Sequence, residues 1–319
     1  MTDAPEISIV IPTRNRFALL TARALRSALE QEGVEHEIVV VDDGSDDGTA
    51  ARVAALEEPR VRVVRRERPG GMAAARNTGI AAARGEWVAL LDDDDVWSPR
   101  KLRAQLETAR TTGAGFVYAG SIAVDAVGNV LHTLYLPEPH ELPEKLLRAC
   151  VLPAGASNVL VRTEILRSLG GFDEALAHIA DWDLWIRLCD VTSAALCDEI
   201  LVAYLLHDEN MHVVSDPSPE LDYLIRKHAH AESPKRIAPD RVGYSRWVAG
   251  QRSRAGLHRE AARVYLREAV SQRAPANVLR AVDALLAKRP SALVRRLGRR
   301  DGARASAPEA PEWVRTYAA

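Results

Sequence analysis

Residues 87–97 read Trp-Val-Ala-Leu-Leu-Asp-Asp-Asp-Asp-Val-Trp, and the rest of the predicted fold is arranged around this stretch. The apolar run Trp87–Leu91 predicts a buried strand, and four carboxylates follow it directly. Four adjacent carboxylates cannot all be ionised close together without a cation nearby. Oxygen ligands at a strand end suit a hard divalent ion such as Mg²⁺ or Mn²⁺, which normally accompanies a substrate diphosphate. The alternative is a solvated acidic turn that caps a helix beginning near Pro99.

Strand and helix patterns alternate on the N-terminal side of this stretch. Apolar runs predict three further strands, at Ile7–Ile11, Glu37–Val41 and Arg60–Val64. Helices are predicted after the first two strands, the first of them about fifteen residues long through Leu29, and a third from Gly71 through Ala83. This alternation predicts an α/β fold whose mostly parallel sheet is flanked by helices. Ligands bind at the carboxyl ends of the strands in such sheets, which brings together Thr13–Arg16, Asp42–Asp43 and Asp92–Asp95.

The pattern becomes less regular after a predicted helix at Pro99–Thr112. The expected elements there are a strand at Phe116–Tyr118, a hairpin within Ala123–Leu136, strands at Ser157–Val161 and Ile200–Leu206, and helices at Thr163–Leu169 and Asp181–Leu188.

Beyond Asp216 the pattern is entirely helical, so we expect a domain boundary there. The predicted domains are residues 1–215, a helical C-terminal region at 216–300 and a disordered tail at 301–319. Helices are expected at Glu220–Ala231, Pro239–Ala255, Leu257–Gln272 and Ala276–Ala287. We expect them to pack on the first domain or on a second subunit, which would make a homo-oligomer.

Composition excludes several classes of protein. The net charge of −2 gives no nucleic-acid signature, so no nucleic-acid partner is expected. The three cysteines fit neither a disulfide framework nor a zinc pattern, which indicates a reducing compartment. Residues 1–6 lack a signal sequence and no apolar run approaches the ~20 residues that span a bilayer, so we expect a soluble cytoplasmic protein. The basic run Arg289–Arg300 is typical of a solvated face, with peripheral membrane contact as the alternative.

Four segments, taken in order, resemble the motifs of family 2 glycosyltransferases with the GT-A fold. They are Pro12-Thr13-Arg14-Asn15-Arg16, Asp42-Asp43-Gly44-Ser45, the acids Asp92–Asp95, and Ala180-Asp181-Trp182-Asp183. The resemblance covers about residues 5–210. It implies a metal-dependent inverting transferase that uses Mn²⁺ or Mg²⁺ and moves a sugar from a nucleotide-diphosphate donor to a nucleophilic acceptor. The acceptor, a glycan, a lipid carrier or a small natural product, stays open.

The resemblance also implies roles for individual residues. Asp43 would accept a hydrogen bond from the base of the nucleotide, and Arg76 would approach the diphosphate. Asp94 is the preferred metal ligand whether the Asp-x-Asp element is read as Asp92–Asp94 or as the pair Asp93–Asp94. The remaining donor-binding residues are Pro12, Thr13, Arg16, Asp92 and Asp93. His207 would lie near the metal or the diphosphate, with an ordinary loop histidine as the alternative.

Inversion by single displacement needs one carboxylate beside the acceptor hydroxyl, and Asp181 matches the family's general base. Many relatives carry Glu-Asp at this point, whereas this chain has Ala180-Asp181. Asp183 is the alternative base. Trp182 could provide an apolar platform for the acceptor.

Two other functions stay open at this point. A nucleotidyltransferase also uses a parallel sheet and a metal, but it needs a glycine-rich phosphate loop that Ile11–Asn15 lacks. A non-catalytic partner protein that binds a nucleotide sugar is favoured by the missing acid at Ala180.

Overall fold

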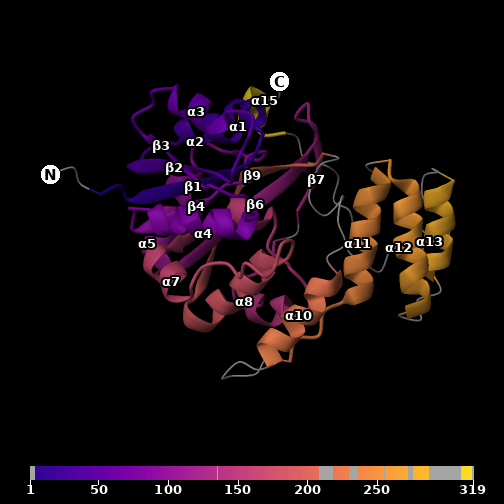
Figure 1. The fold of residues 1–319 in the computed structure, drawn as a ribbon. Coiled ribbons are helices and arrows are strands. Elements are labelled where there is room, and N and C mark those ends of the chain that lie inside the picture. Colours follow the sequence, from indigo (N-terminus) through magenta and orange to yellow (C-terminus); the bar gives the residue numbers. More distant parts are fainter. Residues whose placement is uncertain are drawn as a thin grey trace. The chain divides into compact units, whose positions relative to one another are not determined.

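The chain forms two compact units in the computed structural model (Figure 1). Unit 1 consists of Met1–Leu146, Cys150–Leu205 and Ala307–Ala319, and unit 2 of Leu147–Ala149 and Leu206–Ser306. The structure describes residues 4–134, 136–207, 218–229, 236–254, 256–271, 276–286 and 310–317. The domain boundary predicted at residue 215 lies outside the described residues.

The first half of unit 1 is the parallel α/β arrangement predicted from the sequence. Its strands are β1 (Ile7–Thr13), β2 (His36–Asp42), β3 (Val61–Arg65) and β4 (Trp87–Leu90). They lie in the order β3-β2-β1-β4, and every pairing among them is parallel. Ile7 is in register with both His36 and Trp87, so the strands begin level. Their carboxyl ends therefore meet at one edge of the sheet.

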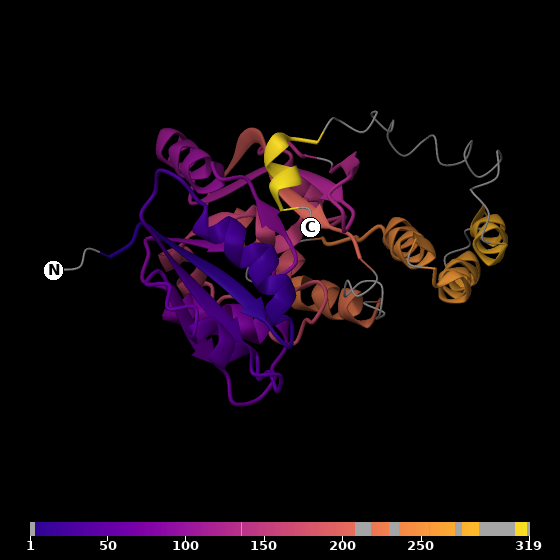
Figure 2. The same cartoon turned by 90° about the horizontal axis from the view of Figure 1, so that it is seen from above.

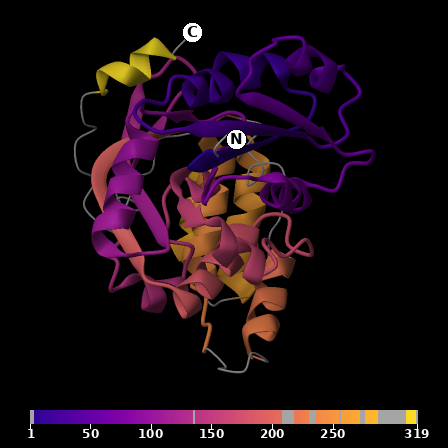
Figure 3. The same ribbon diagram turned by 90° about the vertical axis from the view of Figure 1, so that its left-hand side faces the viewer.

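Helices cover both faces of these strands (Figures 1 and 3). Those on one face are α1 (Phe17–Ala22), α2 (Ala24–Leu29) and α3 (Thr49–Ala54), and α4 (Met72–Ala82) lies on the other. Because side chains alternate along a strand, Ile9 joins the core cluster under α1–α3 while Val10 meets α4. A Cβ on Gly79 of α4 would lie 2.2 Å from Val10 Cγ1, so glycine permits this close approach.

The single helix predicted through Leu29 is divided into α1 and α2 at Arg23. Arg23 leaves helical geometry, with φ −125° and ψ −84°, and its Nη2 donates a hydrogen bond of 2.7 Å to the carbonyl of Ala126. This contact is distant in sequence, so local periodicity could not reveal it.

The second half of unit 1 is a mixed sheet. Its strands are β5 (Val96–Trp97), β6 (Phe116–Val124), β7 (Val130–Thr133), β8 (Leu160–Arg162) and β9 (Ala194–Leu205). Between them lie α5 (Lys101–Thr112), α6 (Leu142–Leu146), the 3₁₀ helix η1 (Gly155–Asn158), α7 (Thr163–Ser168) and α8 (Ala180–Val191). All described strands form one nine-stranded sheet, in which β6 and β9 pair in parallel and β8 lies antiparallel to β4 and β6. The hairpin predicted within 123–136 is that of β6 and β7, whereas β5 was not predicted.

Unit 2 contains the four helices predicted from the sequence. They are α10 (Ser218–Ala229), α11 (Arg241–Arg254), α12 (His258–Ser271) and α13 (Ala276–Leu285). Small side chains allow α11, α12 and α13 to pack closely, with Ala249, Ala261 and Ala281 all buried in one cluster. Among the described residues, no helix is long and apolar enough to cross a bilayer. The basic run Arg289–Arg300 lies outside them.

The prediction of a disordered tail at 301–319 is wrong for residues 310–317, the part of the tail that the structure describes. Residues 312–316 form helix α15 (Glu312–Thr316), which belongs to unit 1 (Figures 1 and 2). Val314 and Tyr317 are each 3% exposed and join an apolar cluster with Val96 and Leu205. The apolar side chains of this helix span only about one turn. Such a short pattern is too weak to predict a helix next to a polar, low-complexity stretch.

Lys101 is fully buried, which the sequence did not suggest. Its Nζ lies 2.7 Å from Gln105 Oε1 and 3.9 Å from the centroid of the Trp97 ring, and neither partner carries a charge. Burial therefore holds the pKa of Lys101 well below its ordinary value of 10.5. Between the folded pKa and 10.5 the unfolded chain binds one more proton than the folded chain, so stability rises with pH in that window.

We therefore expect wild-type protein to gain stability relative to Lys101→Met as the pH rises toward 10.5. The free energy of unfolding of the wild type, minus that of Lys101→Met, should rise by up to about 1.4 kcal/mol per pH unit. Urea denaturation at several pH values measures it. Lys145→Met, at a half-exposed lysine paired with Glu141, is the control that should show no such slope. Parallel curves for wild type and Lys101→Met would contradict the account.

Candidate active site

The four acids form a turn between β4 and β5 that is fixed by backbone contacts. The amide of Asp95 donates to the carbonyl of Asp92 at 3.2 Å, which closes the turn. Asp95 Oδ1 accepts a hydrogen bond of 3.0 Å from the amide of Leu205, at the end of β9. The amide of Asp92 donates to the hydroxyl of Ser157 in η1 at 3.0 Å. Segments far apart in the sequence thus hold the acidic turn in place.

The loop after β1 contacts the middle of this turn. The Thr13 hydroxyl donates to Asp93 Oδ2 at 2.7 Å. Arg16 Nη1 lies 3.0 Å from Asp93 Oδ1 and 3.1 Å from Asp94 Oδ2. The structure therefore brings together the predicted donor loop and the predicted metal ligand. Pro12, the remaining predicted residue of this loop, is buried within β1 opposite Val41.

Arg76 joins the acidic turn to the predicted general base. Its Nη2 lies 2.6 Å from Asp92 Oδ1, and its Nη1 lies 2.7 Å from Asp181 Oδ1. The guanidinium carbon is 5.1 Å from the centroid of the Phe172 ring. The Arg76 side chain is 6% exposed, whereas those of Asp92 and Asp181 are 22% and 21% exposed. A buried cation thus places two partly buried carboxylates on either side of itself.

Burial and mutual repulsion shift the pKa values in this cluster. Burial, with the charge of Asp94, raises the pKa of Asp93 to about 7 despite its contact with Arg16. Burial also raises the pKa of Asp92 and Asp95, and the charge of Asp94 adds to both shifts. Burial opposes the charged form of Arg76, but Asp181 and Asp92 together raise its pKa. The excess of carboxylates favours the binding of a further cation.

Asp43 is engaged with the protein backbone. Its carboxylate accepts hydrogen bonds from the amide of Gly70, at 2.9 and 3.1 Å, and from the amide of Gly71, at 2.8 Å. Arg66 Nε lies 2.8 Å from Asp43 Oδ1. Asp43 therefore fixes the loop that leads into α4, the helix that carries Arg76.

We expect Asp43→Ala to weaken nucleotide binding by about 10- to 100-fold, because hydrogen bonds to a charged group contribute about 1.5–3 kcal/mol each. The rate at saturating donor should fall less than the affinity, because the predicted contact of Asp43 is with the nucleotide, whereas its bonds to Gly70 and Gly71 affect Arg76 only through the loop before α4. Isothermal calorimetry with the free nucleoside diphosphate measures the affinity. Asp46→Ala, an exposed acid of the same loop, is the matched control. Equal affinities for Asp43→Ala and wild type would exclude this role.

The loop before η1 approaches the carboxylate of Asp181 closely. Ala154 and Gly155 both have positive φ angles, of 55° and 49°. A Cβ on Gly155 would lie 2.8 Å from Asp181 Oδ2. Glycine is therefore favoured here by its conformation, and its lack of a side chain permits the close approach of Asp181. Sequence reasoning missed this loop, although its run of small residues before a strand was a usable signal.

Two predictions for the start of α8 are wrong. Trp182 is 1% exposed, and its Nε1 donates to the carbonyl of Leu146 at 2.6 Å, so it packs in the core and offers no platform to an acceptor. Asp183 is fully buried and lies 2.7 Å from Arg187 Nη2. It cannot reach an acceptor hydroxyl, so the alternative base is excluded.

His207 is half-buried and lies in unit 2, two residues after β9 ends. Its role as a metal ligand stays a prediction. Across the described ranges, no three His, Cys, Asp or Glu side chains form a ready-made metal centre. The donor set nonetheless fits a hard cation, because Asp95 Oδ2 is buried without a hydrogen-bond partner among several crowded carboxylates.

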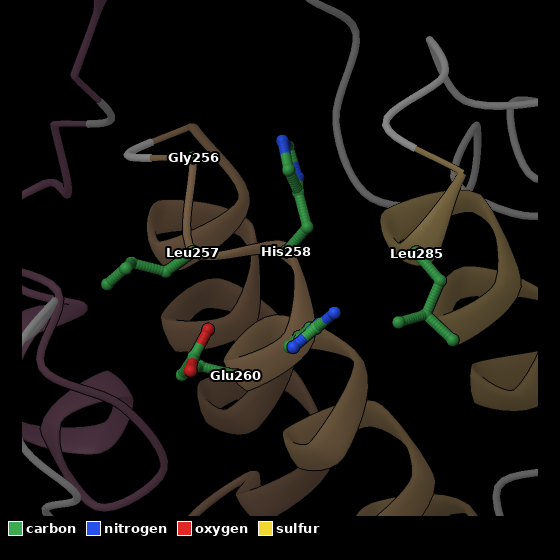
Figure 4. A pocket seen from close by; sticks show the side chains of 6 residues that line it. Gly256, Leu257, His258, Glu260 and Leu285 are labelled. Carbon is green, nitrogen blue, oxygen red and sulfur yellow. The ribbon is translucent and has the colours of Figure 1, made fainter.

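Unit 2 contains a hollow of about 350 Å³ at the start of α12 (Figure 4). Its lining includes His258, Glu260 and Leu285. The side chains drawn there come from α12, the turn before it and the end of α13. None of the predicted site residues lines it.

A family model described as glycosyl transferase family 2 matches residues 8–169, just over half of the chain. The succinoglycan biosynthesis protein ExoO of Rhizobium meliloti (strain 1021) is 42% identical over 160 residues, which cover 50% of this chain and 44% of that protein. The Escherichia coli UDP-Glc:alpha-D-GlcNAc-diphosphoundecaprenol beta-1,3-glucosyltransferase WfgD is 28% identical over 207 residues, 64% of this chain and 79% of that one. The match with ExoO thus spans less than half of that relative's length.

Two solved structures show the same fold at low sequence identity. S. aureus TarS 1–349 in complex with UDP-GlcNAc has a TM-score of 0.59 and 18% identity, covering 89% of this chain and 82% of that one. The mannosyltransferase PcManGT from Pyrobaculum calidifontis, in complex with GDP-Man and Mn²⁺, has a TM-score of 0.57 and 20% identity, covering 93% and 84%. The fold is the GT-A fold predicted from the sequence. With the family model matched over more than half of its length, this chain belongs to glycosyl transferase family 2.

Proposed function

We propose that this protein is an inverting glycosyltransferase that moves a sugar from a nucleotide-diphosphate donor to a hydroxyl group of an acceptor. The observation that carries the proposal is the contact of Arg76 with both Asp92 and Asp181. A transferase of this kind needs a donor site and a base side by side, and this contact joins the acidic turn to an accessible carboxylate on α8.

The donor site in this proposal consists of Pro12, Thr13, Arg16, Asp43, Arg76, Asp92 and Asp93. Asp43 directly follows β2, at the edge of the sheet where ligands bind, and it binds the nucleotide base. Arg16 and Arg76 supply positive charge where the diphosphate lies. The two similar structures whose names include UDP-GlcNAc and GDP-Man support a nucleotide sugar as the donor.

Asp181 is the general base in this proposal. Its carboxylate removes the proton of the acceptor hydroxyl as the oxygen forms a bond to the anomeric carbon, and the bond from that carbon to the diphosphate oxygen breaks. Arg76 Nη1 donates a hydrogen bond of 2.7 Å to Asp181 Oδ1 and so fixes the direction of the carboxylate. Gly155 leaves the other carboxylate oxygen uncovered by a side chain.

Asp94 is the residue of unit 1 that would hold a Mn²⁺ or Mg²⁺ ion, which as a Lewis acid would neutralise charge on the leaving diphosphate. Arg16 contacts Asp94 and so orients its carboxylate. The Mn²⁺ named with the Pyrobaculum calidifontis structure supports a divalent ion.

A saccharide hydroxyl is the acceptor we propose, because the names of ExoO and WfgD refer to succinoglycan biosynthesis and to a GlcNAc-diphosphoundecaprenol. We propose a cytoplasmic location for the reaction.

The alternative is a binding protein without catalytic activity, suggested by the missing acid at position 180. Ala180 is 4% exposed, so a carboxylate at that position would be buried and would need a partner of its own. The burial of Ala180 therefore weakens this alternative.

The test is a panel of nucleoside diphosphates and nucleotide sugars, each with and without Mn²⁺. One nucleoside diphosphate should raise the melting temperature, since a ligand at 100 times its Kd stabilises by about 2.7 kcal/mol. The matching nucleotide sugar should then release its nucleoside diphosphate when saccharide acceptors are added. Binding without release by the wild-type protein would support the non-catalytic alternative, and no binding by any member of the panel would overturn the proposal.

A further inference from the structure

Residues 310–317, which we call the docking segment, pack on β5, which follows the acidic turn, and on β9, which is hydrogen-bonded to it. Val314 and Tyr317 are buried against Val96 of β5 and Leu205 of β9, with Trp313 packed beside them. The yellow helix α15 lies on unit 1 in Figure 2, although unit 2 separates it from the rest of that unit in the sequence.

Polar contacts fix the end of this segment on α2. The Tyr317 hydroxyl donates to Glu30, and the Arg26 guanidinium lies 5.3 Å from the centroid of the Tyr317 ring. Arg26 Nη1 also donates to the carbonyl of Thr316 at 3.2 Å. A segment of eight residues with two buried side chains and these contacts has one defined position on unit 1.

The same strand residues contact the docking segment on one side and the acidic turn on the other. Val96 follows Asp95 directly, and the amide of Leu205 is the donor to Asp95 Oδ1. Side chains alternate along β9, so Leu205 points toward the docking segment while Tyr204 points away from it. Tyr204 instead packs against the main core cluster of unit 1, which contains Leu91 and Trp97.

We infer that the docking segment is a positioning element of the active site: Val314 and Tyr317 hold Val96 and Leu205, and these in turn hold Asp95 and the acidic turn. No residue of the segment needs to touch the substrate. The expected effect of the segment on donor binding rests on the proposed function. Its expected effect on the position of the acidic turn does not, because that effect needs no ligand.

The test uses the full chain with Val314→Asp, which places a charge in the buried cluster. Thr316→Asp adds the same charge at an exposed position of the same helix and is the matched control. Amide hydrogen exchange of Leu205 should become faster in Val314→Asp and stay unchanged in Thr316→Asp. Affinity for the nucleoside diphosphate should fall about 3- to 30-fold in Val314→Asp alone, the range usual for coupling through packed side chains.

Rescue in trans separates positioning from a general loss of structure. A synthetic peptide of residues 310–319, added to Val314→Asp, should restore slow exchange at Leu205 and nucleotide affinity with a saturable dependence on peptide concentration. The same peptide carrying Val314→Asp should do neither. If Val314→Asp does not fold, Tyr317→Phe, which removes only the contact with Glu30, should still accelerate exchange at Leu205.

Unchanged exchange at Leu205 in the folded Val314→Asp variant, or in Tyr317→Phe when the former does not fold, would overturn the inference. Faster exchange with unchanged nucleotide affinity would also overturn it, because the segment would then be structural only. If the wild-type protein binds no nucleotide, the proposed function fails, and exchange at Leu205 still decides whether the segment holds the turn.

Discussion

Asp181→Asn should lower turnover by about 10²- to 10⁴-fold, the usual contribution of a positioned general base. Asparagine keeps the shape of the side chain and can still accept the hydrogen bond from Arg76 Nη1, so the local structure should survive. Donor affinity should change little, because the base acts on the acceptor. Steady-state rates with the true acceptor, together with calorimetry for the donor, measure both quantities.

Asp183→Asn is the informative control for that result. Asp183 is fully buried and paired with Arg187, whose Nη1 and Nη2 donate to the carbonyls of Leu169 and Gly171. Weakening this pair should lower the melting temperature, while the folded variant should retain most of its turnover. A larger loss of turnover in Asp183→Asn than in Asp181→Asn would reverse the assignment of the base.

Asp94→Ala is expected to reduce turnover by more than about 10²-fold, because a bound metal contributes several kcal/mol to stabilising the charge of the transition state. The fold should persist, since Arg16 is 26% exposed and keeps its contact with Asp93 when Asp94 is replaced. Turnover measured over a range of Mn²⁺ concentrations and the melting temperature of the variant check both statements.

Chelation provides the control for the metal. Wild-type protein treated with a chelator should lose turnover to the level of Asp94→Ala and regain it when Mn²⁺ is restored. Near-normal turnover of Asp94→Ala in the presence of the chelator would show that the metal assignment is wrong.

The parallel half of the sheet could be predicted because each of its strands is a continuous apolar run bounded by polar residues. The same logic placed Thr13, Asp43 and Asp92 at one edge, since parallel strands end together. Their partners could not be predicted in this way. The contact of Arg76 with Asp181 joins segments far apart in the sequence, and no periodic pattern specifies it.

Burial of single polar or aromatic residues was wrongly predicted at Trp182 and not predicted at Lys101. Trp182 was expected at the surface of the site because an indole suits a sugar face, but its Nε1 finds an acceptor inside the core. Lys101 carries a charge that ordinarily indicates exposure, yet its stem and ammonium group lie between Trp97 and Gln105. Such environments depend on the packing of several elements, which composition does not reveal.

The return of the docking segment to unit 1 has a consequence for biosynthesis. A ribosome makes the chain from its N-terminus, so the whole of unit 2 is synthesised before residues 310–317 appear. Until then the apolar surface of Val96, Ile122 and Leu205 lacks the side chains that later bury it. A nascent chain of this protein therefore leaves a hydrophobic patch beside the acidic turn uncovered until its last residues are made.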